Sequence, residues 1–192
     1  MDADNFAELV DRYQDSLVNY LWHLTRSRDR AEEIAQDAFV RLYRSIANCR
    51  EDSIAPYLFR IATNAAISEI RRERRWKLLL PMLTAAHPSS EAATDRVASD
   101  EIRSKVAAAL DKLPVKFRAP LVLYEIEEWP YQEIARALGC RIGTIKSRIS
   151  RARALLRVEL EPWWIGGDHD RERNWRCDAA PAASEGVAPI QV

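Results

Sequence analysis

The sequence predicts an all-α protein of two small helical domains joined by a flexible linker. Apolar residues recur every three or four positions in several long stretches, which is the spacing of one face of a helix. No stretch shows the strict alternation expected of a half-buried strand. The helical spacing is weak over 76–98 and stops after residue 162, so we expect domains at 1–75 and 99–162, a linker at 76–98 and a mobile tail at 163–192. A short helix at Trp76–Leu80 within the linker is left open.

Three helices are expected in the first domain. The first spans about residues 5–24, where the apolar side chains keep one face through five turns. The second ends near Ala47, with Asp29 as its expected N-cap and Glu32 reaching back to that cap. The third begins near Pro56, because proline suits a first turn where its missing N–H costs nothing.

Four helices are expected in the second domain. The first of them spans residues 99–113 and the next has helical spacing over 115–127. Pro120 falls inside that spacing, so the helix either starts close to Pro120 or is kinked there.

The last two helices have the pattern of a helix-turn-helix. A short amphipathic helix from Tyr131 ends at Gly139, which tolerates the backbone of a sharp turn. In the following helix Ile142 and Ile145 begin an apolar face. From Arg141 to position 157 there are six cations and no acid, so the opposite face fits a DNA major groove. A basic surface helix of a small bundle is the alternative.

The net charge of the chain does not indicate any class of binding partner, because 29 Lys and Arg residues balance 29 Asp and Glu residues. The distribution is uneven, since residues 101–162 hold twelve cations against eight acids and residues 60–77 hold six against two. Two separate basic segments predict two contacts with a polyanion.

The remaining composition favours a cytoplasmic protein. The three cysteines are an odd number and have no CxxC spacing, as in proteins of a reducing compartment. No apolar run reaches the roughly 20 residues that cross a bilayer. The N-terminus is acidic and amphipathic, unlike a secretory or transit peptide.

An enzyme or a metal protein is poorly supported. His23 lies on a long amphipathic helix and His87 lies in the expected linker. His169, Asp170 and Cys177 have no recognised metal-ligand spacing. We therefore expect no catalytic residue, no metal and no cofactor.

Two stretches together resemble the extracytoplasmic-function (ECF) group of bacterial RNA polymerase sigma factors. The first comprises AEEIAQDAFVRLYRS (31–45) and APYLFRIATNAAISEIRRERR (55–75), and the second is LPVKFRAPLVLYEIEEWPYQEIARALGCRIGTIKSRISRARALL (113–156). The resemblance implies a non-enzymatic subunit that directs core polymerase to promoters and melts them with its first domain. The family often has a glycine and a serine where Glu128 and Pro130 stand here.

The resemblance implies a contact between residues 31–45 and the clamp helices of the largest polymerase subunit. A merely solvated helix face is the alternative. The residues expected to bind polymerase are Gln36, Asp37, Phe39, Arg41 and Arg44.

The third helix is similar to the segment that reads and opens the minus-ten element. Asn64 stands where the family lines a pocket for a flipped base, which an amide can read with both a donor and an acceptor. A plain surface amide is the alternative. The cations expected to hold the phosphates of the opening duplex are Arg60, Arg71, Arg72, Arg74 and Arg75.

Residues 144–153 resemble the helix that recognises the minus-thirty-five element. Arginine or lysine there would suit guanine, which offers two acceptors in the major groove. The residues expected to reach base edges are Lys146, Ser147, Ser150 and Arg151, and those expected to hold phosphate are Thr144, Arg148 and Arg153.

The resemblance also implies an anti-sigma partner that keeps the protein inactive, with a membrane-bound form of that partner left open. The rival hypothesis is a stand-alone helix-turn-helix regulator. Such a regulator would need to dimerise to read two half-sites.

Overall fold

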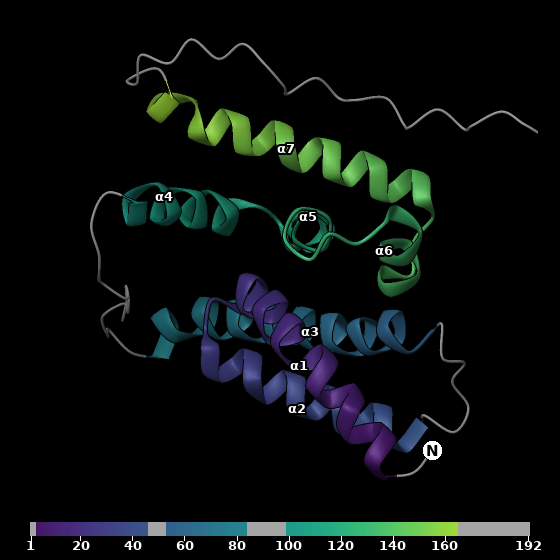
Figure 1. Ribbon diagram of the computed structural model, residues 1–192. Helices are drawn as coiled ribbons and strands as arrows, with labels where there is room; N and C mark the ends of the chain where they lie inside the picture. The colour runs from purple at the N-terminus through teal and green to yellow at the C-terminus, as the bar shows by residue number, and fades with distance from the viewer. Residues whose placement is uncertain (1–2, 46–52, 84–98, 165–192) are drawn as a thin grey trace, which may run out of the picture.

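The computed structural model describes residues 3–45, 53–83 and 99–164, and within these ranges the chain forms seven helices and no strand (Figure 1). The all-α prediction is therefore confirmed. The linker over 84–98 and the tail beyond 164 lie outside the described residues. The helices are α1 (Ala3–Thr25), α2 (Arg28–Ser45), α3 (Ile54–Leu83), α4 (Ser99–Lys112), α5 (Val115–Glu125), α6 (Tyr131–Leu138) and α7 (Ile142–Trp164).

Helices α1, α2 and α3 form the N-terminal domain around a shared apolar core. Leu17 and Leu21 of α1 and Leu58 of α3 are fully buried in it. The hydroxyl oxygens of Tyr20 and Thr63 lie 2.8 Å apart inside this core. Burial raises the pKa of Tyr20 above its usual range, so its hydroxyl stays protonated and can be satisfied by this hydrogen bond.

The start of α2 differs from the sequence expectation. The helix begins at Arg28, and the N–H of Arg30 donates to the hydroxyl of Ser27 at 3.3 Å. Ser27 therefore occupies the capping position that we assigned to Asp29, which lies inside the first turn. Glu32 accepts a hydrogen bond from Arg28 at 2.9 Å instead of reaching back to a cap.

Helix α3 is longer than predicted. It continues without a break past the arginine block to Leu83. Residues 76–83, which the sequence assigned to the linker with a short helix at Trp76–Leu80 left open, are therefore part of α3. Four of these eight residues are leucine, which has high helix propensity, and Pro81 lies in the last turn of the helix. The helix extends for about 45 Å.

Helices α4 to α7 form the C-terminal domain, with α5 seen nearly end-on at its centre in Figure 1. The apolar residues of α5 pack against α6 and α7. The helix starts at Val115 and carries Pro120 buried in its interior, so a start close to Pro120 is wrong. That proline cannot donate to the carbonyl one turn earlier, and it therefore removes one hydrogen bond from this helix.

The last helix reaches beyond the predicted domain boundary. The tail was expected from residue 163, but α7 ends at Trp164. The ammonium of Lys105 on α4 lies 4.0 Å from the centroid of the Trp163 ring. Lys112 and Glu159 form an ion pair between the same two helices, so α4 holds the end of α7.

The two domains are in direct contact. Helix α6 lies against α3, and α5 lies against α1 (Figure 1). The sequence predicted two domains and a connection between them, but it did not predict this contact.

Substitutions in the turn between α6 and α7 test whether its positive φ requires glycine. Gly139 has φ 61° and no atom lies within 4 Å of a Cβ built there, so Gly139→Ala introduces backbone strain without a clash. We expect the free energy of unfolding to fall by about 1 kcal/mol, measured by urea denaturation. Gly143 has equally open space but lies in α7. Gly143→Ala should raise the same quantity by about 0.5 kcal/mol, and equal effects of the two variants would refute the strain argument.

Candidate nucleic-acid interface

Helices α6 and α7 form the predicted helix-turn-helix. Gly139 caps α6 in the left-handed conformation, and the N–H of Cys140 donates to the carbonyl of Ala135 at 3.0 Å. The N–H groups of Thr144 and Ile145 both donate to the carbonyl of Arg141 and so begin α7. The buried side chains that join the two helices are Ile134, Ala137, Ile145, Ile149 and Ala152.

Ile142 is an exception to the expected apolar face. It is the first residue of α7 and is 40% exposed. The helical spacing placed it on the buried side, but the buried apolar face of α7 begins at Ile145 and continues through Ile149 and Ala152.

The residues expected to meet base edges are accessible. The exposed side chains on α7 include Lys146, Ser147, Ser150 and Arg151. The hydroxyl of Ser147 donates to the carbonyl of Thr144 at 2.9 Å. The cationic face of α7 therefore lies outside the protein core and is open to a polyanion.

Two arginines expected at phosphates have intramolecular partners. Arg153 pairs with Glu125 at 2.6 Å, and the guanidinium of Arg148 donates to the sulfur of Cys140 at 3.2 Å. Partial burial lowers the pKa of Arg153, but the hydrogen bond and charge of Glu125 outweigh it and raise that pKa. Both arginines are half-buried, so they are oriented before any ligand arrives.

An aromatic pair that sequence reasoning missed supports this face. The rings of Tyr124 and Tyr131 stack at 4.8 Å with an interplanar angle of 1°. Arg153 lies 5.3 Å from the centroid of Tyr124, and Lys146 lies 5.7 Å from that of Tyr131. Burial, followed by a hydrogen bond and the charge of Tyr124, raises the pKa of Tyr131 to about 12. A loop separates the two tyrosines, so no helical periodicity links them in the sequence.

The expected minus-ten residues form an exposed stripe on α3. Asn64 is exposed, and its side-chain amide has no hydrogen-bond partner among the described residues. Arg60 is exposed and lies 5.2 Å from the ring centroid of Tyr57. Arg72 pairs with Glu69 at 2.8 Å. The other exposed cations of the stripe are Arg71, Arg74 and Arg75.

Four of the five expected polymerase contacts lie on the exposed face of α2. They are Gln36, Asp37, Arg41 and Arg44. Phe39 differs, because it is 7% exposed and belongs to the core. Phe39 also lines the groove between α1 and α2, so a partner could reach it only through that groove.

That groove contains apolar side chains that the sequence analysis did not single out. Trp22 is 38% exposed and Val40 is 49% exposed, and both line the groove. They lie off the main apolar faces of their helices, which is the sequence signal that could have identified them.

Family models match both domains. The Sigma-70 region 2 model matches residues 9–76, and the Sigma-70 region 4 model matches residues 103–156. These two matches appear in the chain order expected from the resemblance, and together they cover helices from both domains.

Curated relatives extend across both matches. The chain is 33% identical to the ECF RNA polymerase sigma factor SigW of Bacillus subtilis over 83% of this chain and 90% of that protein. It is 34% identical to the ECF RNA polymerase sigma factor SigE of Mycolicibacterium smegmatis over 80% of this chain. The aligned part covers only 60% of the length of that SigE protein.

Solved structures have the same fold. The sigma factor RpoE of Bartonella quintana, in complex with the anti-sigma factor NepR, matches 83% of this chain and 98% of that chain with a TM-score of 0.65 and 26% identity. CnrH, in complex with the cytosolic domain of CnrY, matches 84% of this chain and 90% of that chain with a TM-score of 0.64 and 24% identity.

The Arg153–Glu125 pair predicts a measurable effect on DNA binding. Glu125→Gln removes the carboxylate that neutralises Arg153, so non-specific affinity for duplex DNA should rise. The slope of log affinity against log salt concentration should steepen by about 0.9, the value for one additional phosphate contact. Glu161→Gln makes the same charge change at an exposed position of α7 and serves as the control. Identical salt slopes for both variants would show that Arg153 does not reach phosphate.

Proposed function

We propose how this chain acts from the premise that it belongs to the ECF group of RNA polymerase sigma factors. As a member of that group it directs core RNA polymerase to promoters and initiates transcription. The observation that carries the proposed mechanism is the presence of two separate exposed cationic faces, one on α3 and one on α7.

The N-terminal domain would read and open the minus-ten element. The amide of Asn64 is exposed and can pair with the edge of a base that has left the stack. The arginines of the α3 stripe would hold the phosphates of the opening duplex. Their positions along one helix match a strand that follows the helix axis.

The C-terminal domain would read the minus-thirty-five element in the major groove. Lys146 and Arg151 are exposed long cations and suit the two acceptors of guanine. Arg148 and Arg153 are held by neighbours and would contact phosphate. This division separates residues that specify sequence from residues that set the position of the helix.

Core polymerase would dock on the exposed face of α2. Gln36, Asp37, Arg41 and Arg44 offer polar and charged contacts there, and the adjoining groove offers Trp22 and Val40. An apolar centre with a charged rim is the composition of a protein interface. We propose that the part of the polymerase that binds this face is the clamp helices of its largest subunit.

An anti-sigma factor is a further proposed partner. The similar RpoE structure is a complex with the anti-sigma factor NepR, and the exposed apolar residues of the α1–α2 groove would suit such a protein. Within the described ranges no helix is long and apolar enough to cross a membrane. We propose that the chain acts in the cytoplasm, where polymerase is found, and that it catalyses no reaction by itself.

The test of the proposed function is reconstituted transcription. Purified chain and core polymerase should together give run-off transcripts from a cognate promoter, and neither should do so alone. A stand-alone regulator would bind operator DNA, fail to co-purify with core polymerase and support no transcription.

Arg151 should contribute to sequence recognition. Arg151→Ala removes a cation that can pair with guanine, and it should cost about 1–3 kcal/mol of binding free energy at the cognate upstream element. Competition binding against promoters substituted at single base pairs measures this cost. Arg157→Ala, at an exposed position further along α7, is the control. Equal weakening of Arg151→Ala on every sequence would assign Arg151 to phosphate alone.

Asn64 should act after polymerase binding. Asn64→Ala should leave affinity for core polymerase unchanged and reduce open-complex formation, because the flipped base loses its pairing partner. Permanganate footprinting of the melted bases measures the open complex. Ser68→Ala, one turn further along the same exposed stripe, is the control. Unchanged footprints in Asn64→Ala would refute this role.

A further inference from the structure

Two stacked tyrosines lie next to the cationic face of α7. Tyr124 is near the end of α5, and Tyr131 is the first residue of α6. Their rings are parallel to within 1°, and the ring centroids are 4.8 Å apart. Both side chains are half-buried and pack against the apolar core. Helix α7 contacts both α5 and α6 (Figure 1), so the tyrosine pair forms a surface on which side chains of α7 rest.

Each of the two rings has one cation of α7 over it. The ammonium of Lys146 lies 5.7 Å from the centroid of Tyr131, and the guanidinium of Arg153 lies 5.3 Å from the centroid of Tyr124. Lys146 and Arg153 are seven residues apart, so they lie on the same side of α7, about 10 Å apart along its axis. A cation within about 6 Å of a ring centroid is attracted by the negative face of the ring. The four side chains therefore form one tyrosine–cation cluster.

The loop between the two tyrosines is held against α5. The N–H groups of Ile126 and Glu127 donate to the carbonyl of Val122 at 3.0 and 3.2 Å. The N–H of Trp129 donates to the carbonyl of Leu123 at 2.9 Å. These bonds return the chain to the end of α5 just before α6 begins. The spacing of the two rings is therefore set by the backbone as well as by their own contact.

The same loop contains a strained residue. Glu128 has φ 55°, which is in the left-handed region that favours glycine. A residue with a side chain keeps such a conformation only where surrounding contacts impose it. The next residue supplies one such contact, because the ring centroid of Trp129 lies 4.5 Å from that of Phe59 on α3. The course of the chain from one tyrosine to the other is thus defined by its surroundings.

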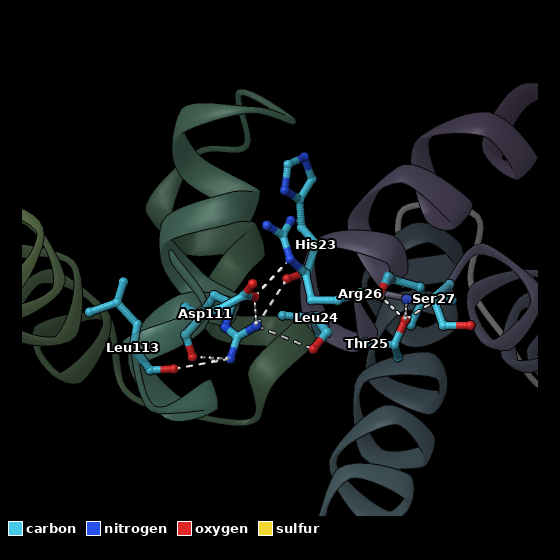
Figure 2. A network of polar contacts seen from close by, with 9 residues as sticks. His23, Leu24, Thr25, Arg26, Ser27, Asp111 and Leu113 are labelled. Atoms are coloured by element: carbon cyan, nitrogen blue, oxygen red, sulfur yellow. Dashed lines mark hydrogen bonds and ion pairs between the residues drawn. The ribbon is translucent and has the colours of Figure 1, made fainter. Parts of the chain in front are cut away.

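Helix α5, which carries Tyr124, is anchored by the buried guanidinium of Arg118 in its first half. This side chain is 5% exposed. Its Nη1 donates to the carbonyls of His23 and Leu24 at 3.3 and 3.4 Å, and it pairs with Asp111 at 3.2 Å (Figure 2). A buried cation with partners on several sides resists rotation of the helix that carries it. Tyr124 is therefore presented by a helix of fixed orientation.

Arg151 has no comparable support. It is exposed on α7, and among the described residues it has no hydrogen bond, ion pair or ring contact. Lys146 is also exposed, but it lies over the ring of Tyr131. The two cations expected at base edges thus differ in whether a neighbouring ring orients them, which provides an internal comparison within one helix.

A lysine that no ring orients is a poor reader of bases. Its ammonium is a compact charge on a flexible stem of four carbons, so base acceptors and nearby phosphates compete for it. A contact that exists before DNA binds reduces the side-chain entropy lost on binding and favours one orientation. The contact between Lys146 and the Tyr131 ring therefore favours a base over a phosphate as the partner of this cation.

We propose that Tyr131 and Tyr124 are positioning residues for base recognition, which hold Lys146 in a fixed place relative to Arg153. A base-reading cation and a phosphate-binding cation then meet DNA as one unit. The inference rests on the proposed function, because that function assigns Lys146 to a base and Arg153 to a phosphate. Neither tyrosine has to touch DNA. Burial and a hydrogen bond with Tyr124 raise the pKa of Tyr131 to about 12, so at neutral pH the pair carries no charge of its own.

Selection of DNA by the chain assembled with core polymerase tests the proposal. The probe is a pool of DNA duplexes with a randomised segment, and sequencing of the bound fraction gives the base preference at each position. Lys146→Ala and Arg151→Ala identify the base pairs that each cation reads. Tyr131→Leu should lower the preference at the Lys146 base pair about threefold to tenfold and leave that at the Arg151 base pair unchanged. Tyr131→Phe keeps the ring and should behave as the parent chain does.

A matched control separates positioning from loss of structure. Phe117→Leu removes another half-buried ring of α5, which has the ammonium of Lys116 4.9 Å from its centroid. This variant should leave every base preference unchanged, and circular dichroism should show the same helix content in all variants. Equal losses of preference in Phe117→Leu and Tyr131→Leu would overturn the specific role of the tyrosine pair.

Binding to a duplex that the selection does not enrich separates positioning from direct contact with DNA. Tyr131→Leu should not weaken this binding, because Lys146 released from the ring becomes free to pair with phosphate. A Tyr131 hydroxyl that bound phosphate would make Tyr131→Phe weaker on every duplex by the same factor. That result would replace the positioning role with a backbone contact.

Nuclear magnetic resonance of the free full chain reports the position of Lys146 without polymerase. An aromatic ring shifts the resonances of protons that lie over its face. The methylene protons beside the Lys146 ammonium, assigned with Lys146→Ala, should therefore resonate upfield of those of an exposed lysine. This shift should persist in Tyr131→Phe and disappear in Tyr131→Leu.

An unshifted Lys146 in the parent chain, or a base preference that survives Tyr131→Leu, would overturn the positioning role. Lys146→Ala without effect on any base pair would do so as well, because no base-reading cation would then need to be held. A parent chain that does not assemble with core polymerase, or that enriches no sequence, would instead overturn the proposed function and with it the assignment of Lys146 to a base. The resonance shift, measured without polymerase, would still show whether Tyr131 holds this cation.

Discussion

The buried guanidinium of Arg118 is the interaction on which the relative placement of the two domains depends. A charge removed from water is tolerated only when hydrogen bonds and an opposite charge replace its hydration. Here the replacements come from both domains, namely the final carbonyls of α1 and the carboxylate of Asp111. A small rotation of one domain against the other would move the carbonyls of α1 away from the cation and leave it only with partners of its own domain, such as Asp111. The contact is therefore a defined arrangement of the two domains.

The same division between buried and exposed faces explains how the chain can contact a polyanion without a net positive charge. Each helix uses its apolar stripe in the core of its own domain, which leaves the cationic sides of α3 and α7 outside. Some cations there already have partners, as Arg153 has in Glu125. These partners orient the arginine side chains and also reduce their attraction for phosphate. The arginines therefore bind DNA less strongly than free cations would, but they meet it in a fixed orientation.

Membership of the ECF sigma factors gives these surfaces a common purpose. A member of this group directs core polymerase to promoters and initiates transcription, and under the proposed function the two exposed cationic faces meet promoter DNA.

The sequence by itself determined the helices, the two domains and the helix-turn-helix, because these depend on local spacing and on one turn glycine, Gly139. It also predicted which cations of α7 would be exposed, since the apolar stripe of that helix leaves only one side free. It did not determine where α3 ends. The burial of Phe39 was indicated by the sequence, because Phe39 shares the apolar spacing of Ala35 and Leu42. The resemblance nevertheless assigned Phe39 to the polymerase contact. The tertiary structure alone decided that Arg118 would join the domains, since a single arginine in an amphipathic stretch shows no sequence signal of the carbonyls it will meet.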